Sequence, residues 1–87
     1  MTLKYVALIR KEETTDFWVD IPDLPGCVSY GETIEETEEH FKETLDMHLE
    51  DMREEKLTLP EPRSREEVLS AEEDPYVLDY IIEIKHL

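Results

Sequence analysis

Carboxylates, three histidines and one cysteine are the side chains in this sequence that could do chemistry. Metal-dependent cleavage of a phosphodiester needs several carboxylates that converge on two metal ions. The acids that a nuclease could use are Glu36, Asp79 and Glu83. The expected first strand, Leu3–Arg10, contains no acid that could serve as the first metal ligand. A nuclease is therefore the least favoured of the functions considered below.

The histidines do not have the spacing of a metal site. His40 and His48 lie eight residues apart, whereas a helical zinc site places two histidines at i and i+4. Glu36 and His40 have the i, i+4 spacing, which is common by chance in so acidic a segment. His48 falls on an apolar stripe, which favours a packing role, and His86 belongs to an expected frayed tail. We expect no metal and no cofactor.

Cys27 is the only cysteine, so the chain has no internal disulfide and no multi-cysteine zinc site. A nucleophilic cysteine needs a nearby base and a lowered pKa. The neighbours Gly26 and Val28 supply neither. A small, half-buried strand residue is the favoured interpretation of Cys27. With two glycines in all, the chain has no glycine-rich phosphate loop.

The formal net charge is −15 over 87 residues. Phosphate groups need a basic face, so this charge argues against direct binding of nucleic acid. It suits either a basic partner or a well-solvated surface. The length predicts one domain with a thin core, for which oligomerisation adds buried area. No apolar run approaches the ~18 residues of a membrane span, and the charged N-terminus is unlike a signal peptide, so we expect a cytoplasmic protein that binds no membrane.

Hydrophobic alternation predicts four strands, at Leu3–Arg10, Phe17–Ile21, Cys27–Tyr30 and Tyr76–Lys85. The first two strands are close enough in sequence to form an antiparallel hairpin. In the second strand, Trp18 points away from the face that carries the other apolar residues. In the last strand, every second residue from Tyr76 onward is apolar, which predicts one continuous buried face.

Thr33 and Glu36 form a capping-box pattern that opens a long helix. Residues at spacings of three and four then give one buried stripe, which consists of Ile34, Thr37, Phe41, Leu45, His48, Leu49 and Met52. The segment from Glu32 to Glu55 has a net charge of −9. The outward face of this helix is therefore expected to be an acidic ridge.

Ser64 and Glu67 form a second capping box, for a short helix that extends to about Glu73 before Pro75 stops it. The element order β-β-β-α-(α)-β predicts an α+β fold with two layers. The long helix can cover one face of the sheet only. We expect the other face, with Trp18 and parts of the first and last strands, to be covered by a second subunit.

The segment FWVDIPDLPGCVSYGETIEE, from Phe17 to Glu36, resembles the signature of the HicB-like antitoxin family. In that family an aromatic strand runs into I-P-D-L-P-G-C-x-[ST]-x-G-x-T-x-E-E-A. The matching structural positions in this sequence are Pro22, Pro25, Gly26, Cys27, Gly31, Thr33 and Glu36. The resemblance covers about residues 3–62 well and the last strand in outline. Thr37 stands where the family usually has alanine.

The resemblance implies a partial ribonuclease-H-like fold and a homodimer or homotetramer. It implies neutralisation of a HicA-type toxin, a small basic mRNA interferase, by covering its RNA-binding face and its catalytic histidine. Many family members add a C-terminal DNA-binding domain; we expect residues 1–87 to form a single HicB-like domain without one. The alternatives are a solitary HicB-like oligomeric binding module without a toxin, and a ribonuclease-H-like nuclease.

Candidate interface residues cluster around the proline-rich corner that follows the second strand: Trp18, Asp20, Asp23, Leu24 and Tyr30. Tryptophan is enriched at energetically important interface positions, although packing against the sheet is an equally favoured role for Trp18. Within the corner, Pro22 is expected to end the strand. Pro25 and Gly26 suit a tight turn, and Leu24 is placed to fill one end of the core.

Overall fold

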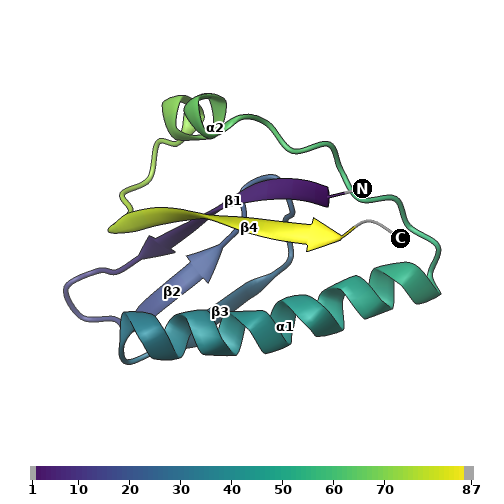
Figure 1. Ribbon diagram of the computed structural model, residues 1–87. Coiled ribbons are helices and arrows are strands. Elements are labelled where there is room, and N and C mark those ends of the chain that lie inside the picture. The colour runs from purple at the N-terminus through teal and green to yellow at the C-terminus, as the bar shows by residue number, and fades with distance from the viewer. Residues whose placement is uncertain (1, 86–87) are drawn as a thin grey trace.

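The computed structural model describes residues 2–85, so His86 lies outside the described residues. The strands are β1 (Thr2–Arg10), β2 (Phe17–Asp20), β3 (Val28–Gly31) and β4 (Leu78–Lys85), and the helices are α1 (Ile34–Glu54) and α2 (Arg65–Ala71). They form one antiparallel sheet in the order β3-β2-β1-β4, with α1 on one side and α2 on the other (Figure 1). The predicted α+β class and element order are confirmed, whereas the ribonuclease-H-like assignment stays a prediction.

Strand β1 is central in the sheet. It forms the predicted hairpin with β2, in which Ile9 lies opposite Val19, and it pairs along eight positions with β4. Because helices lie against both faces of β1, the side chains from Tyr5 to Ile9 are apolar and buried on both faces. This explains why Leu3–Arg10 reads as a nearly continuous hydrophobic run.

The main core lies between the sheet and α1. The predicted helix stripe is confirmed, since Thr37, Phe41 and Leu45 are buried and the remaining apolar stripe residues pack against the same core. The apolar face of β4 contributes Leu78, Tyr80, Ile82 and Ile84. Tyr76 lies outside β4 and is partly exposed.

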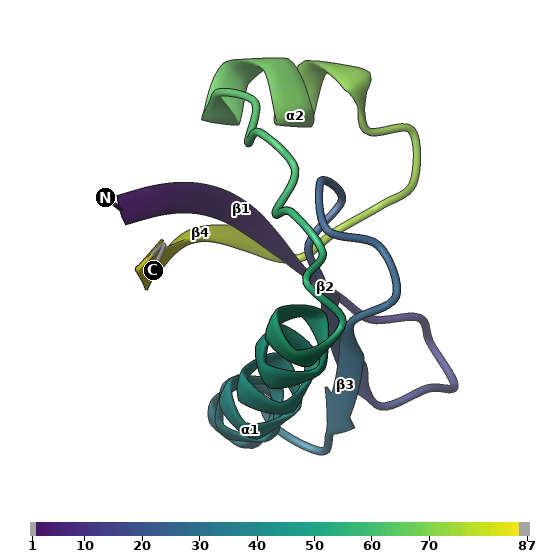
Figure 2. The same ribbon diagram turned by 90° about the vertical axis from the view of Figure 1, so that its right-hand side faces the viewer.

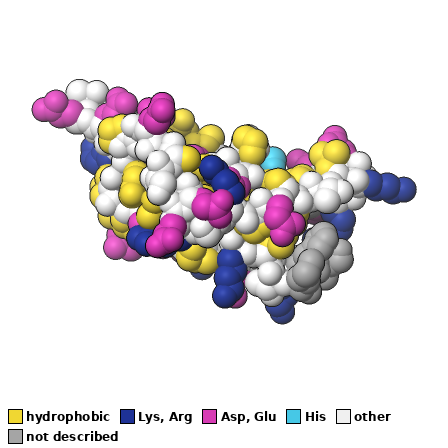
Figure 3. All heavy atoms as spheres, turned by 90° about the horizontal axis from the view of Figure 1, so that it is seen from above, with side chains coloured by type: hydrophobic (Ala, Val, Ile, Leu, Met, Phe, Trp, Pro, Cys, Tyr) yellow, Lys and Arg dark blue, Asp and Glu magenta, His cyan; other side chains and the backbone are white. Residues whose placement is uncertain are grey.

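The second face of the sheet is not bare, which corrects the two-layer prediction. Val68 of α2 is buried against Val6 and Leu8 of β1, so α2 forms a third, partial layer (Figure 2). Val68 and Leu69 of α2 thus cover part of the sheet face that we expected a second subunit to cover. The exposed large apolar side chains on this face lie at its flanks, with Val28 and Tyr30 on one side and Ile81 on the other. Seen from the α2 side, hydrophobic side chains appear between scattered acidic and basic ones (Figure 3).

The helix ends follow the predicted capping residues. The Thr33 hydroxyl accepts a hydrogen bond from the Glu36 amide at 3.0 Å, although the return bond of a capping box is not present among the described residues. At Ser64 both bonds of the box are present, with Glu67. Helix α2 ends at Ala71 rather than at Glu73. Glu72 is the C-cap residue in an extended conformation, and its carboxylate accepts a hydrogen bond from Arg10, as described below.

Helix α1 ends in a Schellman motif. The amide of Lys56 donates to the Arg53 carbonyl at 3.1 Å, and the amide of Leu57 donates to the Met52 carbonyl at 2.8 Å. Lys56 has a φ of 59°, the left-handed conformation that this motif requires and that usually belongs to glycine. In the described part of the chain, neither helix is both long and apolar enough to cross a bilayer.

Candidate functional site

The proline-rich corner is a rigid structural turn. The Leu24 amide donates to the Ile21 carbonyl at 3.0 Å, so residues 21–24 form a β-turn with Pro22 at its second position. Leu24 is 2% exposed and packs in the main core. Its predicted core-filling role is confirmed, and it offers no surface to a partner. Gly26 has a φ of 93°, which explains a glycine after Pro25.

Gly31 is needed for a different reason, since it is the last residue of β3 and lies against the start of α1. A Cβ at this position would be 2.6 Å from the Thr37 amide nitrogen and 2.7 Å from its hydroxyl oxygen. The Thr37 hydroxyl donates a hydrogen bond to the Thr33 carbonyl at 2.6 Å. Thr37 thus occupies the space that a side chain at position 31 would need. The first turn of α1 is thus seated directly on β3.

Asp20 belongs to a buried ionic cluster. The Arg10 Nε donates to Asp20 Oδ1 at 2.7 Å, and its Nη1 donates to Glu72 Oε1 at 2.8 Å. The same guanidinium donates long bonds to the carbonyls of Asp74 and Pro75. The bond to Asp20 raises the pKa of Arg10, and Arg10 in turn holds the pKa of Glu72 below its ordinary value. This cluster fastens the segment after α2 to the sheet.

Asp23 has a similar structural role. Its two carboxylate oxygens accept from the backbone amide and the Nε of Arg63, each at 2.7 Å. This contact joins the corner to the connector between α1 and α2. Tyr5 holds the same connector from the sheet, because its hydroxyl donates to the Pro60 carbonyl. Of the five candidate interface residues, Asp20, Asp23 and Leu24 are therefore engaged within the fold.

Trp18 and Tyr30 remain on the surface, and the structure brings them together. They are direct cross-strand partners on β2 and β3, on the face opposite α1. Trp18 is half-buried, and Tyr30 is 59% exposed. Val28, two residues before Tyr30, is also exposed on this face. We call Trp18, Val28 and Tyr30 the aromatic patch.

The residues with possible chemistry have structural partners. Asp79 accepts from the Arg65 Nε at 2.6 Å, and Glu83 lies 3.9 Å from the Lys4 ammonium. Burial raises the pKa of the Cys27 thiol, which makes it a poorer nucleophile. Within residues 2–85, no three histidine, cysteine, aspartate or glutamate side chains are grouped closely enough to hold a metal ion.

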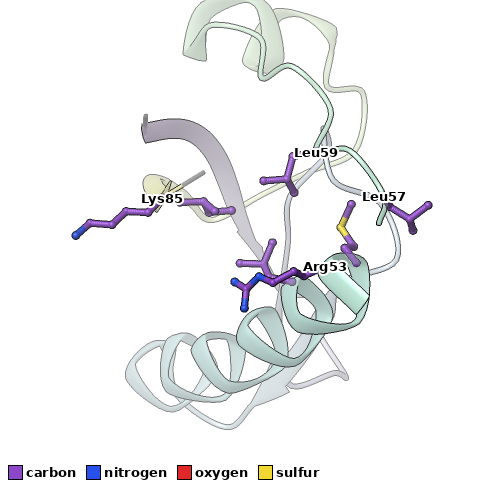
Figure 4. A pocket seen from close by; sticks show the side chains of 7 residues that line it. Arg53, Leu57, Leu59 and Lys85 are labelled. Atoms are coloured by element: carbon purple, nitrogen blue, oxygen red, sulfur yellow. The ribbon is translucent and has the colours of Figure 1, made fainter. Parts of the chain in front are cut away.

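A small pocket of about 100 Å³ lies where the end of α1, the connector and the end of β4 meet. Leu59 and Arg53 reach toward it, whereas Leu57 and the Lys85 ammonium point away (Figure 4). Its walls are mostly aliphatic, so they offer no set of converging polar groups for catalysis.

Comparison with known proteins agrees with the corner motif. A family model for HicB-like antitoxins of bacterial toxin–antitoxin systems matches residues 5–86. This chain belongs to the HicB-like antitoxin family. A UPF0150 protein of Thermoplasma acidophilum is 30% identical over 64 residues, which cover 74% of this chain and 93% of that protein.

A 14.9 kDa protein of Haemophilus phage HP1 is 33% identical over 66 residues, covering 76% of this chain but only 47% of the phage protein. The HicB-like chain thus spans about half the length of that relative.

Solved structures share the fold. The N-terminal domain of the Burkholderia pseudomallei antitoxin HicB is similar with a TM-score of 0.75 and 23% identity, over 97% of this chain and 100% of that domain. A chain of a toxin–antitoxin complex from Streptococcus pneumoniae is similar with a TM-score of 0.65 and 24% identity. That match covers 97% of this chain and 68% of the other.

Sequence reasoning missed two residues that organise this HicB-like domain. Arg10 closes the apolar run of the first strand, and a charged residue in that place is a signal for an internal partner. Val68 and Leu69 are the apolar pair that the short helix needs to bury, which is the signal for Val68.

Proposed function

We propose that this HicB-like protein neutralises a small, basic HicA-type toxin by binding it and covering its RNA-binding face and active site. The proposal rests on one observation, which is the family match across residues 5–86. The similar Streptococcus pneumoniae structure is that of a toxin–antitoxin complex, which supports the same kind of partner here.

Charge supports this partner independently of the family. The net charge of −15 gives a strongly negative potential, and the acidic ridge of α1 is exposed. A negative protein attracts a basic one over a distance of about one Debye length, ~8 Å at physiological ionic strength. Association should therefore be fast at low salt and slower at high salt.

The aromatic patch is the surface that we assign to the toxin. Its aromatic side chains are of the type that supply most of the binding energy in interfaces. Asp20, which lies opposite Val28 of the patch, is already paired with Arg10 of the same chain. Contact at the patch would thus be largely apolar, and the unpaired acids of α1 would act mainly through long-range attraction.

The second candidate function is a solitary HicB-like binding module without a toxin. The homo-oligomer expected for either function is also a proposal.

Co-expression tests the proposed function. The gene adjacent to that of this protein is expressed from an inducible promoter, with and without the HicB-like chain. Growth arrest by the neighbour alone, and normal growth with both, is the expected result. Growth arrest that persists when both are expressed would contradict the proposal, and a neighbour that does not arrest growth would favour the solitary module.

A further inference from the structure

Strand β4 forms one edge of the sheet, and no strand of the described structure pairs with its outer side. It has eight residues, Leu78–Lys85, and its only strand neighbour there is β1. Alternate residues of an edge strand direct their backbone N–H and C=O groups outward, where they can pair with another strand. No proline interrupts β4, and in the strand order it forms the edge opposite β3.

The opposite edge is protected, which makes β4 the exception. Strand β3 has only four residues. The Tyr30 carbonyl already accepts a hydrogen bond from the His40 Nδ1 of α1 at 2.7 Å, so one of its edge groups is satisfied. Short length, charged side chains and proline are usual defences against strand pairing. Strand β4 is long and contains no proline, and its charged residues Asp79, Glu83 and Lys85 limit the registers in which it can pair.

A groove of about 400 Å³ runs between β4 and α1. Its floor is apolar and includes Phe41 and Leu45 from α1, and Tyr80 and Ile82 from β4. Burial raises the pKa of Tyr80 to about 12, with a further contribution from the Glu38 carboxylate. A strand added to β4 would place its inward side chains along this groove. The edge and the groove therefore form one site for an extended segment.

The side chains of β4 complement a second β4 in antiparallel orientation. With a two-fold axis through Ile82, Asp79 lies opposite Lys85 of the second copy, and Tyr80 lies opposite Ile84 of the second copy. The two Ile82 side chains then meet at the groove. Both copies of α1 lie on the same side of the joined sheet.

Neighbouring registers are disfavoured by charge or by burial. A shift by two residues places Asp79 opposite Glu83 of the second copy in one direction, and Glu83 opposite itself in the other. Like charges directly opposite each other destabilise a strand pair. A shift by one residue sets the apolar face of one copy beside the charged face of the other. Among these registers, the one centred on Ile82 pairs Asp79 with Lys85 of the second copy and keeps the two apolar faces side by side.

We propose that two copies of this chain associate through antiparallel pairing of their β4 strands, centred on Ile82, and form a continuous eight-stranded sheet. This interface differs from the aromatic patch, which lies at the other end of the sheet. The inference does not depend on toxin neutralisation, and its test contains no toxin. The dimer would leave both aromatic patches free.

Light scattering and sedimentation equilibrium of the purified full-length chain test the interface, at about 0.15 M salt so that repulsion between the acidic copies is screened. We expect a mass of twice 10.3 kDa at high concentration. The matched variants are Ile81→Glu and Ile81→Lys, since residue 81 is exposed and faces Glu83 of the second copy. Ile81→Glu should raise the dimer dissociation constant at least tenfold more than Ile81→Lys.

Lys85→Glu should also raise the dissociation constant at least tenfold, because it faces Asp79 of the second copy. Lys56→Glu makes the same change in net charge at an exposed position beyond α1, and should change the dissociation constant less than twofold. A monomer at all concentrations would overturn the proposal. A dimer that is indifferent to the residue 81 and 85 variants, or equally sensitive to Lys56→Glu, would overturn it as well.

Discussion

Trp18 lies directly opposite Tyr30 on the neighbouring strands β2 and β3, on the face of the sheet that α1 does not cover. Alternation along Phe17–Asp20 places the tryptophan on this face. The edge position of β3 leaves the tyrosine exposed. Two aromatic side chains therefore stand side by side on an otherwise charged protein, as expected of a contact surface.

Replacing either aromatic residue should weaken binding of the toxin. Trp18→Ala and Tyr30→Ala should each cost about 2 kcal/mol or more, a loss of ~30-fold in affinity, if they are central to the contact. Calorimetric titration with the toxin measures the loss. Met47→Ala removes an exposed apolar side chain from α1 and should leave the affinity unchanged. Equal affinities for all four proteins would place the contact elsewhere.

The Arg10 cluster should be important for stability. Arg10→Leu leaves Asp20 and Glu72 without their cation, and removing one partner of a buried ion pair costs about 3–5 kcal/mol. Because Asp20 is partly exposed, we expect a loss near the lower end of that range. Urea unfolding measures it. Lys42→Leu removes a cation from the exposed surface and should change stability by about 0.5 kcal/mol at most; similar losses for the two variants would show that Arg10 has no special role.

Glu72 should make stability depend on pH in the acid range. Its pKa is lowered from 4.5, chiefly by the hydrogen bond from Arg10. A lowered pKa in the folded state stabilises the fold above the unfolded-state pKa, and the gain is lost as the pH falls through the folded-state pKa. The stability difference between wild type and Glu72→Gln should thus be largest near neutrality and shrink below pH 4.5. Glu73→Gln removes a carboxylate from an exposed position and is the matched control, and an equal pH dependence for the two variants would contradict the role of Arg10.

Gly31→Ala should destabilise the protein by about 1–3 kcal/mol, the usual cost of overpacking. The added Cβ meets the amide nitrogen and Cα of Thr37 as well as its hydroxyl. Shortening the side chain in Gly31→Ala/Thr37→Ala should therefore not relieve the clash. Thermal unfolding of the double variant and of Thr37→Ala alone checks this. Equal stability of these two proteins would mean that the backbone contact is unimportant.

Lys56→Gly should stabilise the protein by up to about 1 kcal/mol, since a left-handed conformation costs a residue with a Cβ roughly that much. The neighbouring Glu55→Gly is the control, because Glu55 has a φ of −84° and gains nothing from glycine. A higher unfolding midpoint for Lys56→Gly alone is the expected result. No gain would indicate that the Lys56 side chain compensates for the strain.

Local patterns predicted most of the fold, because they depend on neighbours in the sequence. The outward direction of Trp18, the two helix starts and the need for glycine at position 26 all follow from residues within one or two turns. No pattern in the sequence assigned an orientation to Tyr30, and only the register of β2 and β3 makes it a neighbour of Trp18.

Contacts between distant segments were not predictable in the same way. Arg10 and Glu72 are 62 residues apart, and Asp23 and Arg63 are 40 apart, so nothing local indicates that they pair. The side of the sheet that α2 covers depends on the path of the connector, which Tyr5 and Asp23 fix. For that reason the sequence predicts Asp20 and Asp23 as interface residues, whereas in the fold both form ion pairs within the chain.

Inhibition of RNA cleavage by the purified toxin tests the central claim most directly. The toxin is incubated with RNA and with increasing amounts of this HicB-like protein, and both cleavage and RNA binding are measured. Cleavage should stop at a fixed molar ratio, and bound RNA should be displaced, with both effects weakened in the Trp18→Ala/Tyr30→Ala variant. Undiminished cleavage and RNA binding at saturating amounts of the wild-type protein would contradict neutralisation by covering the toxin.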